Sequence, residues 1–538
     1  MPKPLRALCL SCVCFTSWLS GAIAQDRPDE AELFGAPASD AADAGAEEAA
    51  VQPTPGAVVD TSKPAAPPAA ESGGGTEPEP ASSRDDAILG GASSPMFSEP
   101  AAPSDPLSIG GQMYIRAQVR SYEDTRIGDS LFSMPSLLDV YFDARPNDRV
   151  RGYVLGRMTY DPTTAGARPQ LSATEAASGS ASLSTLFRAP SSGPRVLLDQ
   201  LWLRFDIAHT VFVTAGKQHV RWGTGHVWSP TDYLHLTPRN PLEIFDARTG
   251  TTMIKLHMPV ESKAWNFYAY GVAEGPEGVP TIQQLGGAVR GEFVFEQTEL
   301  GLGAFAQRGT KPKFAVDVST GIGDFDVFME ASLRNRTDVD RVHYAPNATL
   351  PVPDAQEPWE TDEQYQAKVR SEFAEARYPR YRKEGYRPQF VLGLSYSIKY
   401  NDNDVLTLSA EYFYNPLGYR NNAVYPGLIV PRNVPLQDPA TYFYLGQQYA
   451  ALVVTMPSPF SLDLHSFTLS NLGNFSDRSF VTQLTYTLTL LTHLRLESFV
   501  AVHYGRPTGE FRLRIEIDGV RLLPAGLVDV GVALRLSI

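Results

Sequence analysis

The residues best suited by type to do chemistry lie in one stretch, 223–250. It holds charged or titratable side chains of both signs, namely His226, Asp232, Arg239, Glu243, Asp246 and Arg248. Gly223, Gly225, Pro230 and Pro241 stand among them and permit sharp turns. Hydrolysis, metal binding and electrostatic guidance of a solute are the three kinds of chemistry that such residues could serve.

Hydrolysis and metal binding find no support elsewhere in the chain. The nine histidines show no metal-ligand spacing, and the Asn-Asp-Asn-Asp run at 401–404 fits a tight turn better than a calcium loop. Ser466 and His465 are strand neighbours, so their side chains face opposite sides and cannot act together. The three cysteines are Cys9, Cys12 and Cys14, all before residue 20. We therefore expect no enzyme activity, no metal and no cofactor.

The elements that position these residues follow a period of two. In 109–121 the odd positions are apolar or small while the even positions include Arg116 and Arg120, and 289–296 and 325–331 alternate in the same way. Each such segment predicts a strand with one apolar and one polar face. A soluble β-sandwich also alternates, so this pattern leaves both water and lipid as surroundings of the apolar faces.

Connection lengths distinguish the two. Short links such as 145–148, 208–210 and 457–461 alternate along the chain with long ones such as 161–194, 223–250 and 335–387. Tight turns on one side and long loops on the other are typical of a transmembrane β-barrel. We predict an all-β chain in which 106–538 form a single antiparallel barrel of about 16–18 strands, with both ends on the short-turn side.

The segment before the barrel divides in two. Residues 1–25 combine Lys3 and Arg6, an apolar stretch and a small-x-small site, which predicts a signal peptide cleaved after Ala24. Residues 26–105 hold sixteen acidic and three basic residues with many alanines and prolines, so we expect a disordered periplasmic tether. The tether accounts for most of the net charge of -14, and the nearly neutral remainder gives no indication of nucleic-acid binding.

Basic residues recur on the predicted polar faces. A Lys or Arg facing lipid at mid-membrane costs about 2–4 kcal/mol, so we expect these side chains to line the lumen. They are Arg116, Arg120, Arg157, Arg204, Lys217, Arg221, Lys255 and Arg290. Because Val211, Val213 and Ala215 share the face of Lys217, the assignment of that strand stays open. Acidic residues such as Asp139 and Glu330 are also predicted inward, so the wall either favours anions or forms opposite-charge pairs.

Two segments resemble a known class. The final alternation, from Val528 to Ile538, resembles the closing strand of Gram-negative outer-membrane proteins, although those usually end in an aromatic residue. The segment KQHVRWGTGHVWSPTD at 217–232 is similar to the strand-then-loop segment of porin-like and alginate-export-like barrels. The resemblance implies insertion into the outer membrane by the assembly machinery, and a loop at 223–250 that folds into the lumen and narrows it. The alternative is a loop on the rim, with Trp222 and Trp228 in an aromatic girdle.

These features predict an outer-membrane channel for small polar or anionic solutes, constricted by the loop 223–250. The alternative is a structural or docking barrel in an envelope-spanning export, adhesion or motility complex. In that case the tether would contact peptidoglycan or a periplasmic partner.

Overall fold

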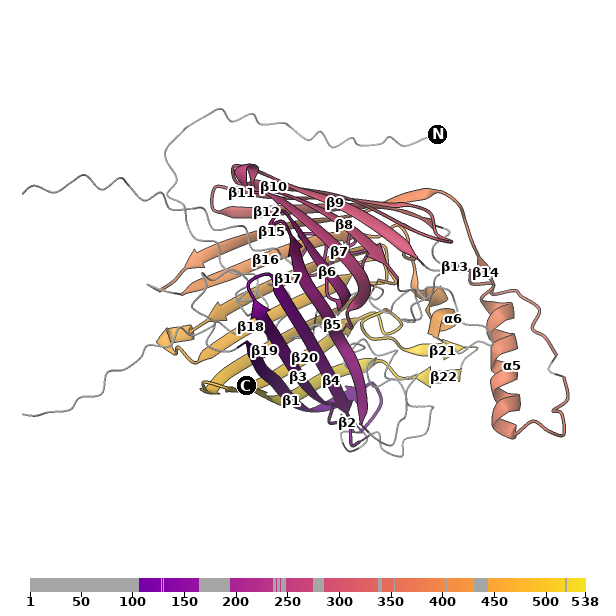
Figure 1. The fold of residues 1–538 in the computed structure, drawn as a ribbon. Helices are drawn as coiled ribbons and strands as arrows, with labels where there is room; N and C mark the ends of the chain where they lie inside the picture. Colours follow the sequence, from indigo (N-terminus) through magenta and orange to yellow (C-terminus); the bar gives the residue numbers. More distant parts are fainter. Residues whose placement is uncertain are drawn as a thin grey trace, which may run out of the picture.

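The fold is a closed antiparallel barrel (Figure 1). The computed structural model describes residues 106–126, 128, 130–163, 194–235, 239, 242, 248–273, 285–336, 341–352, 354–401, 404–429, 444–517 and 520–538. The predicted signal peptide and tether, and Glu243 and Asp246 of the predicted constriction loop, therefore lie outside the described residues.

Eighteen strands form the wall, each hydrogen-bonded to the strand before and after it. In order around the barrel they are β1 (Leu107–Tyr122), β3 (Ser136–Asn147), β4 (Val150–Tyr160), β5 (Arg195–Ile207), β6 (Val211–Gln218), β7 (Thr251–Val260), β8 (Trp265–Val272), β9 (Gly286–Phe295), β10 (Thr298–Gln307), β11 (Lys313–Ile322), β12 (Phe325–Asn335), β15 (Tyr386–Lys399), β16 (Val405–Tyr414), β17 (Gln448–Pro457), β18 (His465–Asn474), β19 (Ser479–Leu491), β20 (Leu494–Gly505) and β23 (Gly526–Ser537).

The first and last strands close the wall. β1 pairs with β3 on one side and with β23 on the other, where Met113 lies opposite Leu536 and Arg120 opposite Asp529. The sheet also includes β2 (Leu131–Ser133), a three-residue strand in the link between β1 and β3 that pairs with the end of β1. The predicted all-β barrel and its strand number are confirmed.

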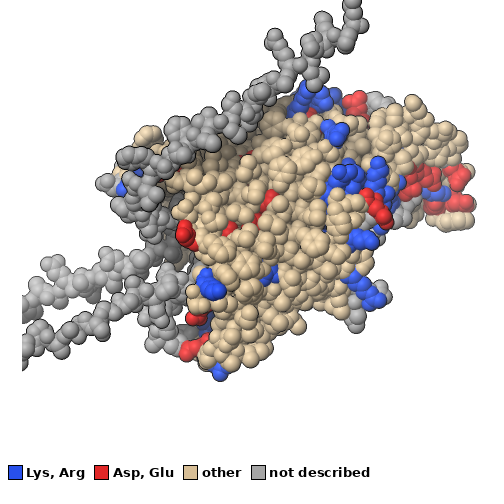
Figure 2. Space-filling view, turned by 90° about the horizontal axis from the view of Figure 1, so that it is seen from above, with Lys and Arg blue, Asp and Glu red and all other residues tan. Residues whose placement is uncertain are grey.

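Alternation sorts side chains between the two surfaces of the wall. In β23, Val530, Val532 and Leu534 are 44%, 47% and 45% exposed, whereas Asp529, Ala533 and Arg535 on the alternate face are buried. The outside is therefore apolar and the charged side chains point into the lumen, which is the reverse of a soluble protein. Figure 2 shows this outer face as largely uncharged, with most Lys and Arg side chains toward the end where the long loops lie.

The links follow the predicted asymmetry. Tight turns join β3 to β4, β5 to β6 and β9 to β10, while the longer links carry the remaining elements at the opposite end of the barrel (Figure 1). These are two short hairpins, β13 (Arg341–Val342) with β14 (Arg380–Tyr381) and β21 (Ile515–Ile517) with β22 (Val520–Leu523), and the helices α5 (Asp362–Arg377) and α6 (Tyr425–Ile429). The 3-10 turn η5 (Asn422–Val424) also lies in a long link, whereas η2 (Glu261–Lys263) and η6 (Pro459–Ser461) lie in the short links from β7 to β8 and from β17 to β18.

Among the described residues, no helix is long and apolar enough to cross a membrane.

Candidate functional site

The chain leaves the wall after β6 and enters the lumen; we call the described residues of this segment, 219–235, 239, 242 and 248–250, the inner loop. Trp222 is 1% exposed and packs against Tyr270 of β8 and Tyr233 of the loop itself, with ring centroids 5.7 and 6.2 Å apart. Arg290, an inward residue of β9, lies 5.6 Å from the Trp222 ring. The loop therefore rests first on the wall next to β6.

Further along, the carboxylate of Glu330 in β12 holds the loop. Glu330 is 0% exposed and alternates with outward Met329, so its side chain points into the barrel. One of its oxygens accepts from the amide of Gly225 at 2.5 Å and the hydroxyl of Ser229 at 3.1 Å, and the other accepts from the hydroxyl of Thr231 at 2.7 Å. Buried hydrogen bonds to a charged acceptor are among the stronger ones in proteins, so this carboxylate fixes both legs of the loop.

Glu411 of β16 holds the tip. It is 3% exposed, and its oxygens accept three successive backbone amides, those of His226 at 2.6 Å, Val227 at 2.9 Å and Trp228 at 3.2 Å. Seven strands separate β6 from β16 in one direction around the barrel and nine in the other. The inner loop therefore crosses the lumen and contacts a wall strand almost opposite to β6.

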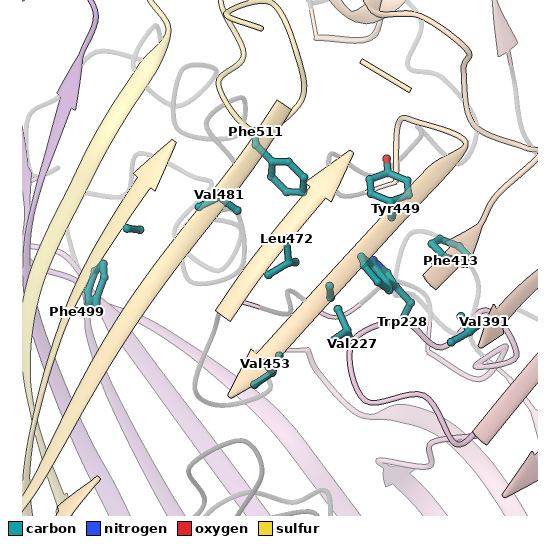
Figure 3. Packing of buried hydrophobic residues seen from close by; sticks show 12 residues of the cluster. Val227, Trp228, Val391, Phe413, Tyr449, Val453, Leu472, Val481, Phe499 and Phe511 are labelled. Carbon is teal, nitrogen blue, oxygen red and sulfur yellow. The ribbon is translucent and has the colours of Figure 1, made fainter. Parts of the chain in front are cut away.

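The tip also packs into an apolar cluster on the far wall. Figure 3 shows Val227 and Trp228 among Phe413, Tyr449 and Leu472. The Trp228 ring lies 5.7 Å from that of Phe413 and 5.8 Å from that of Tyr449. Burying such a ring contributes roughly 2–3 kcal/mol, which adds to the hydrogen bonds of Glu411.

The loop returns to its starting point through Asp232, His235 and Arg248. His235 and Arg248 contact the Asp232 carboxylate at 2.9 and 3.0 Å. Burial acts to raise the pKa of Asp232, but the neighbouring His235 and Arg248 hold that pKa at about 2. The amide of Gly250 then donates to the Asp199 side chain of β5 at 3.1 Å, which ties the end of the loop to the wall.

The inward arginines form pairs with carboxylates on neighbouring strands. Arg120 donates to Asp529 at 2.8 and 2.7 Å, Arg157 to Asp139 at 2.8 and 3.0 Å, and Arg290 to Asp317 at 2.7 and 2.9 Å. Other predicted lumen cations lie on aromatic rings: Arg116 on Phe499 at 4.2 Å, Arg204 on Phe212 at 5.2 Å and Lys255 on Tyr268 at 5.6 Å. Much of the positive charge is thus matched within the wall.

Two of the predicted lumen-lining residues are not inward side chains of the wall. Lys217 stands opposite Leu201 and Thr252, on the same face as Val213 and one residue from the end of β6. That face points outward, and the strand end lets the ammonium reach the membrane interface. Arg221 does not share a strand face with Lys217, because β6 ends at Gln218; it lies in the inner loop and donates to the carbonyl of Gly225.

The aromatic girdle predicted for Trp222 and Trp228 is wrong. Both rings are at most 2% exposed and pack inside the barrel, because the loop that carries them turns inward instead of crossing the rim. Of the predicted constriction residues, His226 lies at the tip, with its ring 4.4 Å from that of Phe328. Asp232 and Arg248 lie on the return leg, where they contact each other, and the Arg239 carbonyl accepts from Tyr444 at 3.2 Å.

A second buried polar cluster joins the long loops near the far wall; we call it the Glu510 cluster. Glu510 accepts from Tyr449 at 2.5 Å and from Asn474 at 2.7 Å, and Asn474 also donates to Asp477 at 2.9 Å. Burial, together with the neighbouring Asp477, raises the pKa of Glu510 to about 8. The cluster fastens the loop between β20 and β23 to the ends of β17 and β18.

Glu411, His235, Asn474 and Glu510 were not predicted as site residues. Glu411 follows the polar alternation of its strand, which every lumen residue of a barrel shares, and His235 and Glu510 lie in loops where no pattern distinguishes them. Among the described residues, no three His, Cys, Asp or Glu side chains gather as they would around a metal ion.

A closed eighteen-strand wall with an apolar outside and a charged inside defines a transmembrane β-barrel of the outer-membrane type. Neither the known protein families nor the curated proteins give a match to this chain. Solved structures similar to it include Acinetobacter baumannii OccAB1, at 10% identity and TM-score 0.44 over 80% of this chain and 96% of that one. Pseudomonas aeruginosa OccK2 is 8% identical with a TM-score of 0.43, covering 80% and 98% of the two chains. A Rhodopseudomonas blastica porin is 10% identical with a TM-score of 0.36, covering 80% and 100%.

Proposed function

We propose that this protein is an outer-membrane channel for small polar or anionic solutes, with the inner loop as its constriction. The observation that carries the proposal is the course of that loop, which Glu330 and Glu411 hold across the lumen. Barrels of 16–18 strands are wide enough to leave an aqueous passage that side chains alone do not fill. A loop fixed inside such a barrel sets the width of the passage.

The wall supports passage of polar solutes more than strong selection of anions. Arg120, Arg157 and Arg290 each face a carboxylate within 3.0 Å, so their charges are largely neutralised. A solute would meet an alternating, hydrogen-bonding surface, with Arg116, Arg204 and Lys255 as the cations on aromatic rings. We place the protein in the outer membrane, inserted by the assembly machinery, and propose residues 26–105 as the part that contacts peptidoglycan or a periplasmic partner.

Conductance of purified protein in planar bilayers tests the proposal. A closed barrel changes gel mobility on boiling, so folded material is first selected by this shift. We expect discrete conductance steps, and a reversal potential in a KCl gradient that reports at most weak anion preference. Folded protein that inserts without any conductance would refute the channel.

A docking role is the second candidate, and the long loop between β12 and β15 favours it. This loop carries α5, which begins with a capping box of Thr361 and Gln364 and projects beyond the barrel (Figure 1). Trp359, just before the helix, is 78% exposed. Pull-down of a partner that disappears on Trp359→Ala, from a barrel that conducts nothing, would favour this role over the channel.

A further inference from the structure

Two histidines connect the inner loop to the barrel wall. His219 contacts Asp199 of β5 through Nε2 at 3.1 Å, and His235 contacts Asp232 through Nδ1 at 2.9 Å. The remaining ring nitrogens, Nδ1 of His219 and Nε2 of His235, face each other at 3.3 Å. The result is an unbroken line from Asp199 through both rings to Asp232.

Counting protons along this line fixes its charge. A carboxylate can only accept, so the ring nitrogens that face Asp199 and Asp232 must carry hydrogens. Two neutral imidazoles have one N–H each and would use both there, which leaves two lone pairs facing each other. The contact between the rings is attractive only when one further proton lies between them.

The ion pairs around the two rings favour the same proton. Two carboxylates contact the pair, Asp199 of β5 and Asp232 of the loop. Arg248 of the loop contacts Asp232 at 3.0 Å, and Arg157 of β4 contacts Asp199 at 3.3 Å and a third carboxylate, that of Asp139 in β3, at 2.8 Å. These connected ion pairs hold three carboxylates and two guanidiniums, so one positive charge on the histidine pair balances them. A second is disfavoured, because burial and the nearby Arg248 lower the pKa of His235.

We propose that His219 and His235 share a single proton and that this proton latches the base of the inner loop to the wall. The inference rests on the proposed channel, because the loop is its constriction. Two separated histidines would each titrate near 6.5, taking two protons below that pH and none above it. When the loop base is held on the wall, the pair keeps one proton across this pH range. The equilibrium constant for holding the loop is therefore largest near pH 6.5, and it falls up to about tenfold per pH unit on either side.

Single-channel recording across pH 4.5–8.5 tests the latch. Release of the loop base should appear as fluctuations of the single-channel current. The fraction of time spent in these fluctuations should be lowest near pH 6.5 and should rise at lower and at higher pH. His235→Gln removes the shared proton but keeps a donor for Nδ1 of His219, so we expect a flat profile. His209→Gln, at an exposed turn far from the loop, is the matched control and should keep the minimum.

Ring ¹⁵N spectra of the histidine-labelled protein give a second measurement that does not depend on conduction. One positive charge spread over His219 and His235 from about pH 5.5 to 7.5, lost in His235→Gln, supports the shared proton. Two neutral or two cationic rings at pH 6.5 would overturn it, whether or not the barrel conducts. Absence of conductance together with a shared proton would refute the channel and leave the proton assignment standing.

Discussion

Removal of the Glu411 carboxylate should release the tip of the inner loop. In Glu411→Ala the amides of His226, Val227 and Trp228 lose their acceptor while still buried. Hydrogen bonds to a charged group contribute roughly 1.5–3 kcal/mol each. Part of that sum is offset by the cost of burying the carboxylate itself, so we expect docking of the tip to weaken by about 3–6 kcal/mol.

The absence of cysteine after residue 14 provides the assay. Val227→Cys places a single thiol in the barrel at a side chain that is 5% exposed when the tip is docked. Its rate of reaction with a water-soluble maleimide then reports the undocked fraction. Since about 1.4 kcal/mol corresponds to a factor of ten, Glu411→Ala should raise the labelling rate by about 10²-fold or more. The contacts of Trp228 and Glu330 still hold the loop in this variant and set the upper limit of the increase.

Glu292→Ala is the matched control, because Glu292 is a wall carboxylate that contacts Arg290 instead of the loop. It should leave the labelling rate unchanged, and both variants should keep the gel-mobility shift of a folded barrel. A rate in Glu411→Ala within about threefold of the parent would refute the reasoning, since the three amides would then contribute nothing net to docking.

Three further predictions concern other contacts. Gly225→Ala should release the tip in the same thiol assay, because a β-carbon there overlaps the carbonyl oxygen of Trp228, whereas Gly271→Ala, with open space around it, should not. Arg120→Ala should lower the free energy of unfolding in urea by about 3–5 kcal/mol, since it leaves Asp529 buried without its guanidinium, whereas Arg149→Ala at an exposed turn should change it little. The raised pKa of Glu510 means that the docked loop between β20 and β23 holds a proton that an exposed glutamate has lost. Docking should therefore weaken as pH rises from about 4.5 to 8, and hydrogen exchange of that loop, corrected for intrinsic rates, should lose this dependence in Glu510→Gln.

The wall of the barrel could be predicted because its surroundings constrain every second residue. Lipid outside and water inside impose strict alternation, and the loop asymmetry distinguishes a barrel from a sandwich. Lys217 shows the limit of the argument. The alternation places Lys217 on the outward face with Val213 and Ala215, whereas the cost of a cation in lipid favours the lumen. That cost is small at a strand end, because the side chain there reaches the membrane interface.

The course of the inner loop could not be read from the sequence. Its anchors Glu330 and Glu411 lie 105 and 184 residues from Gly225 and Val227, which they bind, and along the chain they look like any other inward charge. Trp222 and Trp228 were ambiguous for a similar reason, since a tryptophan just beyond a strand suits a rim as well as a lumen. Only the three-dimensional pairing of loop amides with wall carboxylates decides between them.

The barrel closes only when its first strand, β1, pairs with its last strand, β23. Arg120 and Asp529, which face each other across this seam, are separated by 409 residues, so joining them restricts nearly the whole chain at once. Until the final strand arrives, both borders of the unfinished sheet expose unpaired amides and carbonyls that any other strand could capture. A chain shortened by its last dozen residues would keep most of its hairpins, yet it would remain an open sheet prone to joining its neighbours.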